Sequence, residues 1–516
     1  MRHTINTTVI NSPTGIPGST DGVMMMVIKG VATSTGTKPL VLDTAYLGNT
    51  LASFVSGLGI TPDYDYVNNL SVYQAVNEFY GAAGDGAYLW LVVTATTNAF
   101  NTYVAGNTFQ NLIRGTMTND PTMRCKMIGL GFNPPTTTQS SSDFPAEVIS
   151  TITALQATQV AMFPEGFSFS SILDGYNMSS TATASTIQSM ATKAAPSVSL
   201  CITGSNPNGV SSIGAALGRF ARISIGHGFG EVSDGGISLS TAYLTNGVSV
   251  PILGTTISQG TSLTAGHSYM VVNGPVTYNG LTYSVGSIFS VIAGTLSFSG
   301  TSTTVVDLTT TGTVTPGSTY YVLYGPITHN GVVYGTGQTF VAATGITSFT
   351  GGIISLYNSQ DATKLYPADV NSLGDKQYMF IRTWFNQSGL YWNDGATCDL
   401  AVDPLSTQEF NRVANAMSAD VKTFLTYNVM GKNLPIDPST NAVALSFTKA
   451  LQQDFETLYI DPLIQPVAPN NVGDISSASL TLSGTKVSAN TVNWTYTLVI
   501  NGTPITGSAT GTVQFI

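Results

Sequence analysis

The run Val23-Met24-Met25-Met26-Val27-Ile28 decides the fold class, because it is the first of several short apolar segments that alternate with helical patterns. The other segments that we expect to be strands are residues 88–93, 124–130, 159–163 and 197–203. Residues 72–80, 145–157 and 208–222 have the spacing of helices. Such alternation is typical of βαβ units. The sequence therefore predicts an α/β core with a mostly parallel sheet over residues 19–240.

Two helix starts carry the pattern of a capping box. Ser71 with Gln74 precedes one apolar stripe, and Ser406 with Glu409 precedes another that runs from Phe410 to Leu425. A further helix is expected over residues 442–459, with an inner stripe of Phe447, Leu451, Phe455 and Leu458.

Residues 254–352 are rich in Thr, Ser, Gly and Val, nearly lack charge, and contain a repeat with a period of 51 residues. The two copies span residues 264–300 and 315–351. Asn279-Gly280 in the first copy recurs as Asn330-Gly331 in the second, and Asn-Gly between alternating apolar runs is a strong hairpin signal. The segment is predicted to be an inserted all-β region of two modules.

The helical pattern returns at residues 357–470, and residues 471–516 have the pattern of strands, so the chain should close with an α+β domain that ends in a β arm. In this arm Trp494, Tyr496, Leu498 and Ile500 alternate, Asn501-Gly502 turns, and the strand returns. A terminal hairpin leaves unpaired backbone groups at its edges, so it needs a neighbouring strand.

The first 18 residues offer such a strand. Thr4–Ile10 is β-favouring and uncharged, and a linker rich in Pro and Gly separates it from the core. A short β arm of this kind suits strand addition between subunits. The residues expected to make contacts between subunits are Ile5, Thr7, Val9, Ile10, Leu480, Leu482, Trp494, Tyr496, Leu498, Ile500, Val513 and Phe515.

The low content of charged residues limits the classes of function that this chain can have. Charged residues make up 9% of the 516 residues, against roughly a quarter in an ordinary soluble protein. So few charges suggest burial against copies of the same chain. The net charge is −10 and the chain has no basic cluster, so nucleic acid is not an expected partner. No stretch approaches 18 apolar residues, and no secretory signal opens the chain, so membrane insertion is not expected.

Residues that could carry chemistry are few, and we expect no catalytic residue, cofactor or metal. Cys125, Cys201 and Cys398 lie far apart in apolar stretches and are interpreted as reduced core thiols. The glycine-rich segment 226–230 lacks the lysine of a phosphate loop and is interpreted as a tight turn. Its His227 is the one histidine worth testing. His3, His267 and His329 are expected to face solvent, and the acidic pairs Asp63/Asp65 and Asn393/Asp394 to form Asx turns or caps.

Three blocks in chain order resemble contractile tail sheath proteins of bacteriophages and related injection systems. The first is residues 20–32. The second joins the helix at residues 72–80 to the glycine turn 84–86 and the strand at 88–93. The third comprises residues 376–383, 389–395 and the helix at Asn411-Arg412-Val413. The chain lacks the Trp-Gly-Ala-Arg segment of the better-known sheath branch and has Tyr391-Trp392-Asn393-Asp394 instead.

The resemblance implies a structural subunit that polymerises as stacked hexameric rings around an inner tube and contracts to drive that tube through a bacterial envelope. Implied partners are further copies of the chain, the tube protein, and baseplate and terminator proteins. The implied location is a virion tail assembled in the cytoplasm of a bacterial host. A phage tail and a bacterial injection device both remain open. The alternatives are a surface adhesin whose β modules bind glycans and a hydrolase that uses His227.

Overall fold

The computed structural model describes residues 23–512 except 35, 119–124, 135–139, 166, 224–227, 233–234, 247–250, 253–255, 274, 284–286, 301–302, 310, 325, 336–337, 357–360, 385, 402–404, 413–414, 416–423, 425–427, 429–434, 438, 440–441, 461–474, 483–490 and 501–502.

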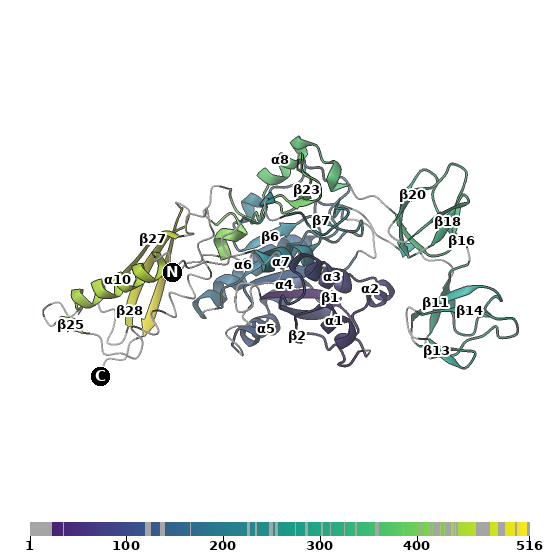
Figure 1. Ribbon diagram of the computed structural model, residues 1–516, viewed down its shortest axis with the longest axis horizontal. Helices are drawn as coiled ribbons and strands as arrows, with labels where there is room; N and C mark the ends of the chain where they lie inside the picture. Colours follow the sequence, from purple (N-terminus) through teal and green to yellow (C-terminus); the bar gives the residue numbers. More distant parts are fainter. Residues whose placement is uncertain are drawn as a thin grey trace, which may run out of the picture.

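A six-stranded mixed sheet forms the centre of the molecule, with strand order β2-β3-β1-β4-β5-β6 (Figure 1). Its strands are β1 (Met24–Gly30), β2 (Ala45–Gly48), β3 (Leu89–Ala95), β4 (Met127–Gly131), β5 (Ser170–Asp174) and β6 (Val198–Cys201). Five of these strands are parallel to their neighbours, and β2 pairs antiparallel with β3 at one edge. Residues from the first apolar run thus lie in β1, between β3 and β4.

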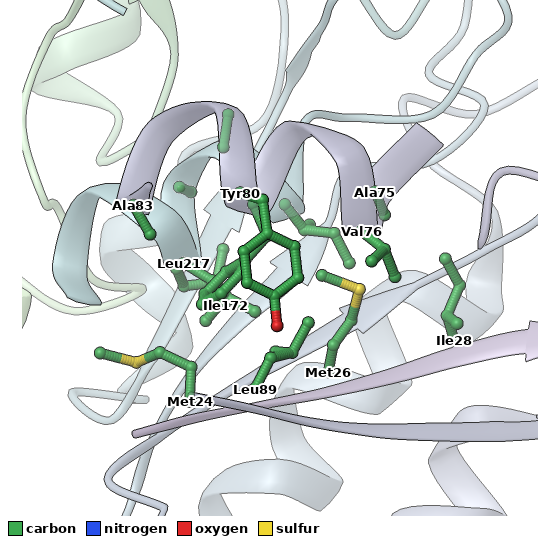
Figure 2. Packing of buried hydrophobic residues seen from close by; sticks show 14 of the residues in the cluster. Met24, Met26, Ile28, Ala75, Val76, Tyr80, Ala83, Leu89, Ile172 and Leu217 are labelled. Atoms are coloured by element: carbon green, nitrogen blue, oxygen red, sulfur yellow. The ribbon is translucent and has the colours of Figure 1, made fainter. Parts of the chain in front are cut away.

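Helices cover both faces of this sheet. They are α1 (Leu51–Leu58), α2 (Pro62–Asn68), α3 (Val72–Ala83), α4 (Phe100–Ala105), α5 (Asn107–Thr118), α6 (Ala146–Met162) and α7 (Ile213–Arg222). Met24, Met26 and Ile28 of β1 pack with α3 and α7 on one face (Figure 2). Met25 and Val27 pack with α4, α5 and α6 on the other. Side chains alternate across a strand, so the unbroken apolar run of β1 supplies both cores.

Two glycines let α7 lie directly against α3. A Cβ atom on Gly214 would lie 1.9 Å from the carbonyl oxygen of Ala75, and one on Gly218 would lie 2.4 Å from that of Phe79. Both distances are far below a normal contact, so these positions require glycine for the helices to approach this closely.

One expected strand is wrong. Residues 159–163 are the end of α6 and the start of a short 3₁₀ helix, Phe163–Glu165. The fifth strand is instead β5, which the sequence analysis did not identify. Helix α6 carries two threonines among its buried residues, and its apolar run at the C-terminal end looked like a short strand when taken alone.

The segment after the insertion extends the core sheet beyond β6. Met379 donates its N–H to Leu200 O (3.0 Å) and accepts from Ile202 N (3.0 Å), and Cys398 N donates to Val198 O (2.7 Å). Elements of this segment are the 3₁₀ turn Ala362–Lys364, α8 (Pro367–Asp375), and the antiparallel pair β23 (Ile381–Arg382) and β24 (Tyr391–Trp392). Two further short elements of the core are the 3₁₀ turn Met190–Lys193 and the pair β7 (Thr203–Gly204) and β8 (Tyr243–Leu244).

The insertion folds into two small β modules (Figure 1). Module 1 consists of β10 (Thr256–Ser258), β11 (Ser268–Asn273), β12 (Val276–Tyr278), β13 (Leu281–Tyr283), β14 (Ile288–Ser290) and β15 (Thr304–Asp307). Module 2 consists of β9 (Pro251–Ile252), β16 (Thr311–Thr313), β17 (Thr319–Tyr324), β18 (Ile327–His329), β19 (Val332–Tyr334), β20 (Thr339–Val341), β21 (Ser348–Thr350) and β22 (Ile353–Leu356).

The modules are nested rather than strung in tandem. Strand β9, which precedes module 1 in the sequence, pairs with β22, the last strand of module 2. The chain therefore begins module 2, builds module 1, and returns to finish module 2. The departing and returning segments lie side by side, which lets the insertion project from one place on the core.

The chain ends in a three-stranded antiparallel sheet of β27 (Ile475–Leu482), β28 (Thr491–Ile500) and β29 (Thr503–Thr512). Helix α10 (Leu445–Ile460) packs against β27 and follows the short pair β25 (Ile436–Asp437) and β26 (Ala442–Val443). Figure 1 places this sheet beyond one end of the α/β core and the β modules beyond the opposite end.

Candidate assembly surface

The C-terminal sheet gathers half of the residues that the sequence analysis named as contacts. Register pairs Leu482 with Trp494 and Leu480 with Tyr496 between β27 and β28. Leu498 of β28 pairs with Ile505 of β29. Positions that are paired across antiparallel strands share a face of the sheet, as do alternate positions along one strand. Leu480, Leu482, Trp494, Tyr496, Leu498 and Ile500 thus occupy one face.

The backbone of this sheet shows which strands can pair further. The sequence analysis expected a two-stranded hairpin, but the structure adds β27 as a third strand and places α10 beside it. In the described part of the chain, β27 and β29 each pair only with β28. Their outer edges, eight and ten residues long, therefore keep unpaired backbone groups that another strand could bind.

The remaining named contacts, Ile5, Thr7, Val9 and Ile10 in the N-terminal arm and Val513 and Phe515 at the C-terminus, lie outside the described residues. Their role in contacts between subunits stays a prediction.

Asp65, a residue of α2, caps the N-terminus of α3. Its Oδ2 accepts the N–H of Gln74 at 2.8 Å. Ser71, the residue that the capping box assigned to this task, instead donates its hydroxyl to Phe132 O at 2.9 Å. The first capping box is therefore wrong, because α2 delivers a carboxylate to the same N–H group. Asp65 is buried, and burial raises the pKa of its carboxyl to about 7.

Two more buried carboxyls lie at the N-terminus of α7. Asp174, at the end of β5, accepts the N–H of Ser211 (2.7 Å) and that of Phe132 (3.1 Å). Glu78 accepts from the Gln74 amide (3.0 Å) and from the Ser205 hydroxyl. Burial raises the pKa of Asp174 to about 7 and also raises that of Glu78. All three acids accept hydrogen bonds from the protein itself, as expected of groups that hold helices and loops together.

In the second acidic pair, Asn393/Asp394, the carboxyl of Asp394 also accepts a backbone hydrogen bond, and so does the nearby carboxyl of Glu409. Asp394 accepts the N–H of the next residue, Gly395, at 2.7 Å, which is not the bond to the residue two positions on that defines an Asx turn. Glu409 accepts the N–H of Phe229 at 2.5 Å, while Ser406 donates to Ala401 O at 3.3 Å. The second capping box is thus also wrong, because Glu409 reaches across to the glycine-rich segment. Burial raises the pKa of both carboxyls, and the charge of Asp394 adds to the effect on Glu409.

The glycine-rich segment is a tight turn in its described part. Glu231 N donates to Gly228 O at 3.2 Å. A Cβ atom on Gly230 would lie 2.4 Å from Asn393 O. The Phe229 ring stacks on Phe220, with centroids 4.2 Å apart, and lies 5.1 Å from Trp392. The chain therefore uses the segment for packing. His227 and His3 lie outside the described residues.

The other two histidines belong to the β modules. His267 is half-buried and bonds Asp307 through Nδ1 at 2.7 Å. His329 is buried, contrary to its expected exposure, with Nδ1 2.9 Å from Ser348 O and Nε2 accepting the N–H of Ala343 at 2.9 Å. In module 1, Tyr278 has the position 51 residues earlier, and its hydroxyl accepts the N–H of Ile292 at 2.8 Å. The repeat thus explains the burial of His329.

The three cysteines are buried and free, as the sequence analysis expected. Burial raises the pKa of Cys125 to about 11 and that of Cys201 to about 12, and it also raises that of Cys398. Among the described residues, no group of three or more His, Cys, Asp or Glu side chains could hold a metal ion. None of the described helices combines the length and apolar character of a membrane span.

No protein-family model matches the chain, and no curated protein matches it. Two solved structures are similar to it over most of its length. One is described as "Cryo-EM structure of the anti-feeding prophage (AFP) baseplate, 6-fold symmetrised", with 10% identity, a TM-score of 0.41, and coverage of 96% of this chain and 91% of that chain. The other is "Cryo-EM Structure of an Extracellular Contractile Injection System, PVC sheath complex in contracted state", with 9% identity, a TM-score of 0.38, and coverage of 95% and 88%.

Proposed function

We propose that the protein is a structural subunit of a contractile sheath, which polymerises as stacked hexameric rings around an inner tube and contracts to drive the tube through a bacterial envelope. The observation that carries this proposal is the terminal sheet. Among the described residues, the outer edges of its strands β27 and β29 have no strand partner. The order of the three sequence blocks supports the same assignment.

Strand addition explains how such a sheet would polymerise. A strand from another subunit that pairs with β27 or β29 satisfies backbone groups that have no strand partner in the described part of the chain. The arm at residues 4–10 is seven residues long, close to the eight residues of β27. In this proposal each subunit donates its arm to one neighbour and accepts an arm from another. The lattice thereby stays connected while the subunits shift.

Contraction in this proposal is a change in how the subunits pack and needs no nucleotide. The extended sheath is metastable, and a signal from the baseplate lets each subunit gain contacts with its neighbours. A few kcal/mol for each subunit lies within the range of ordinary interface changes. The tube protein, baseplate and terminator are the proposed partners. The α/β core faces the tube, and the β modules face outward.

Blocking strand addition tests the proposal. In the double variant Thr7→Pro and Thr8→Pro, the arm loses one backbone N–H group on each of its two edges, so it should no longer pair with a neighbouring sheet. Negative-stain microscopy should then show folded subunits but no tubes, whereas wild type should form hollow tubes. The matched control is Thr14→Pro, which adds a proline to a linker that already contains Pro13 and Pro17.

Circular dichroism decides whether the double variant is folded. Tubes of normal length from that variant, or a wild-type chain that stays monomeric at high concentration, would contradict the proposal.

A further inference from the structure

The β modules have almost no charge. Residues 254–352 contain a single Asp, Glu, Lys or Arg, which is Asp307. Its carboxylate is buried and bonds both His267 and the N–H of Thr309. The described surface of the modules is therefore built from hydroxyl, amide and apolar groups. Ordinary soluble domains cover such a surface with charged side chains.

Large aliphatic side chains are exposed on this neutral surface. The exposed ones are Leu281, Ile288, Ile292 and Leu296 in module 1, and Val332, Val333 and Val341 in module 2. Leu281 and Val332 are 51 residues apart, and each follows the Asn-Gly turn of its module. The same exposed apolar position thus occurs twice in one chain, which argues that it serves a purpose common to both modules.

The edge strands of the two modules also correspond, although their exposed aliphatic residues differ, since Ile288 corresponds to Thr339 and Val341 to Ser290. Strand β14 is an edge strand of the module 1 sheet, and β20 is its counterpart in module 2. In each, the central Phe is buried and the flanking residues are exposed. Ile288 of β14 is 42% exposed, and Val341 of β20 is 60% exposed. Both modules therefore offer an apolar edge that is open in the described chain.

The chemistry of these surfaces selects the occupant. A charged partner would lose its hydration without gaining an ion pair, since the modules offer no free charge. Sugar stacking needs exposed aromatic rings, but Tyr269, Tyr278 and Phe289 are buried in the core of module 1, where their rings stack on one another. A second neutral, aliphatic surface meets neither obstacle, and the other module of a neighbouring copy is such a surface.

We propose that module 1 of one copy docks on module 2 of a second copy, with the surfaces that carry Ile288 and Val341 in contact. The contact is heterologous because the two modules differ in sequence. A contact of this kind can continue from subunit to subunit around a ring or along a helix. The proposal rests on the proposed sheath function and adds to it an outer belt of contacts between modules.

Disulfide cross-linking tests the docking in the full chain. Ile288→Cys and Val341→Cys are made in separate chains, mixed, and oxidised. The three native cysteines are buried, so they should contribute little background. We expect dimers that join the two variants to exceed dimers of either variant alone by about ten-fold, since a specific contact favours one pairing. Val160→Cys, in α6 and 59% exposed, is the matched control and should not cross-link.

A charge substitution adds a second readout. Thr339→Lys changes an exposed residue of β20 that lies on the same strand face as Val341, so the fold should tolerate it. Placed in both cysteine variants, it should lower the yield of mixed dimers by about ten-fold, as expected when an interface residue is lost. Val160→Lys should leave the yield unchanged.

The cross-link is measured in sedimented tubes, identified by microscopy, and in concentrated soluble chains. Tubes without the mixed cross-link would overturn the docking proposal and leave the sheath proposal standing. A mixed cross-link in soluble chains that form no tubes would support the docking proposal and contradict the sheath proposal. Binding of a neutral oligosaccharide that Thr339→Lys abolishes, without any cross-link, would also overturn the docking proposal.

Discussion

Asp65 provides the sharpest test of how this chain uses its few charges. The Asp65→Asn variant keeps an oxygen that can accept the N–H of Gln74 but cannot ionise. The carboxyl has a pKa of about 7 in the folded protein, against 3.8 for an unperturbed aspartate, because burial disfavours its charged form. Between these two values the folded state holds a proton that the unfolded state releases.

The sign of the effect follows from linkage. The stability contribution of Asp65 is fully present below about pH 4 and is lost as the pH rises through about 7. A difference of about three pKa units corresponds to on the order of 4 kcal/mol at about 1.4 kcal/mol per unit. Asp65→Asn should match wild type in stability near pH 4 and exceed it near pH 8 by up to this amount.

Urea denaturation of the full chain at a series of pH values, followed by tryptophan fluorescence, measures this difference. The control is Asp85→Asn, because Asp85 is exposed in the turn between α3 and β3. Its unfolding free energy should follow wild type at every pH. Equal pH slopes for wild type and Asp65→Asn would refute the reasoning. A variant less stable than wild type at pH 8 would show that the bonds of the charged carboxylate to α3 outweigh the cost of its burial.

Two further predictions concern packing. Gly214→Ala should destabilise the core by about 3 kcal/mol, because its Cβ would meet Ala75 O. Its control, Gly81→Ala on the open side of α3, should stabilise the core by about 0.5–1 kcal/mol. Thermal unfolding compares the two variants, and equal melting temperatures would contradict the close approach of α3 and α7. His329→Tyr should preserve the stability of module 2, because Tyr278 accepts the equivalent N–H in module 1. His329→Phe should cost about 1–3 kcal/mol, because it leaves the Ala343 N–H unpaired. Hydrogen exchange at Ala343 measures the loss, and equal protection in the two variants would contradict this role of residue 329.

Local patterns were sufficient where one segment carries the whole signal. The apolar run at residues 23–28 predicted β1, and the 51-residue repeat with its Asn-Gly turns predicted two β modules. Residues 159–163 show the limit of this approach, because a short apolar run cannot by itself distinguish the end of a buried helix from a strand. The candidate assembly surface was predicted from alternation at Trp494, Tyr496, Leu498 and Ile500, but its third strand, β27, pairs across a loop and has no local signal that fixes its register.

The sequence by itself determined that this chain has few charges, an alternating α/β core, a repeated neutral insertion and strand-forming ends. Only the tertiary structure decided how the charges are used and how the insertion is built. Asp65, rather than Ser71, accepts the N–H of Gln74 at the start of α3. Strand β9, which precedes module 1 in the sequence, pairs with the last strand of module 2. Both outcomes depend on contacts between residues distant in the chain. The free energy of such contacts comes from burial and hydrogen bonds that exist only once the chain has folded.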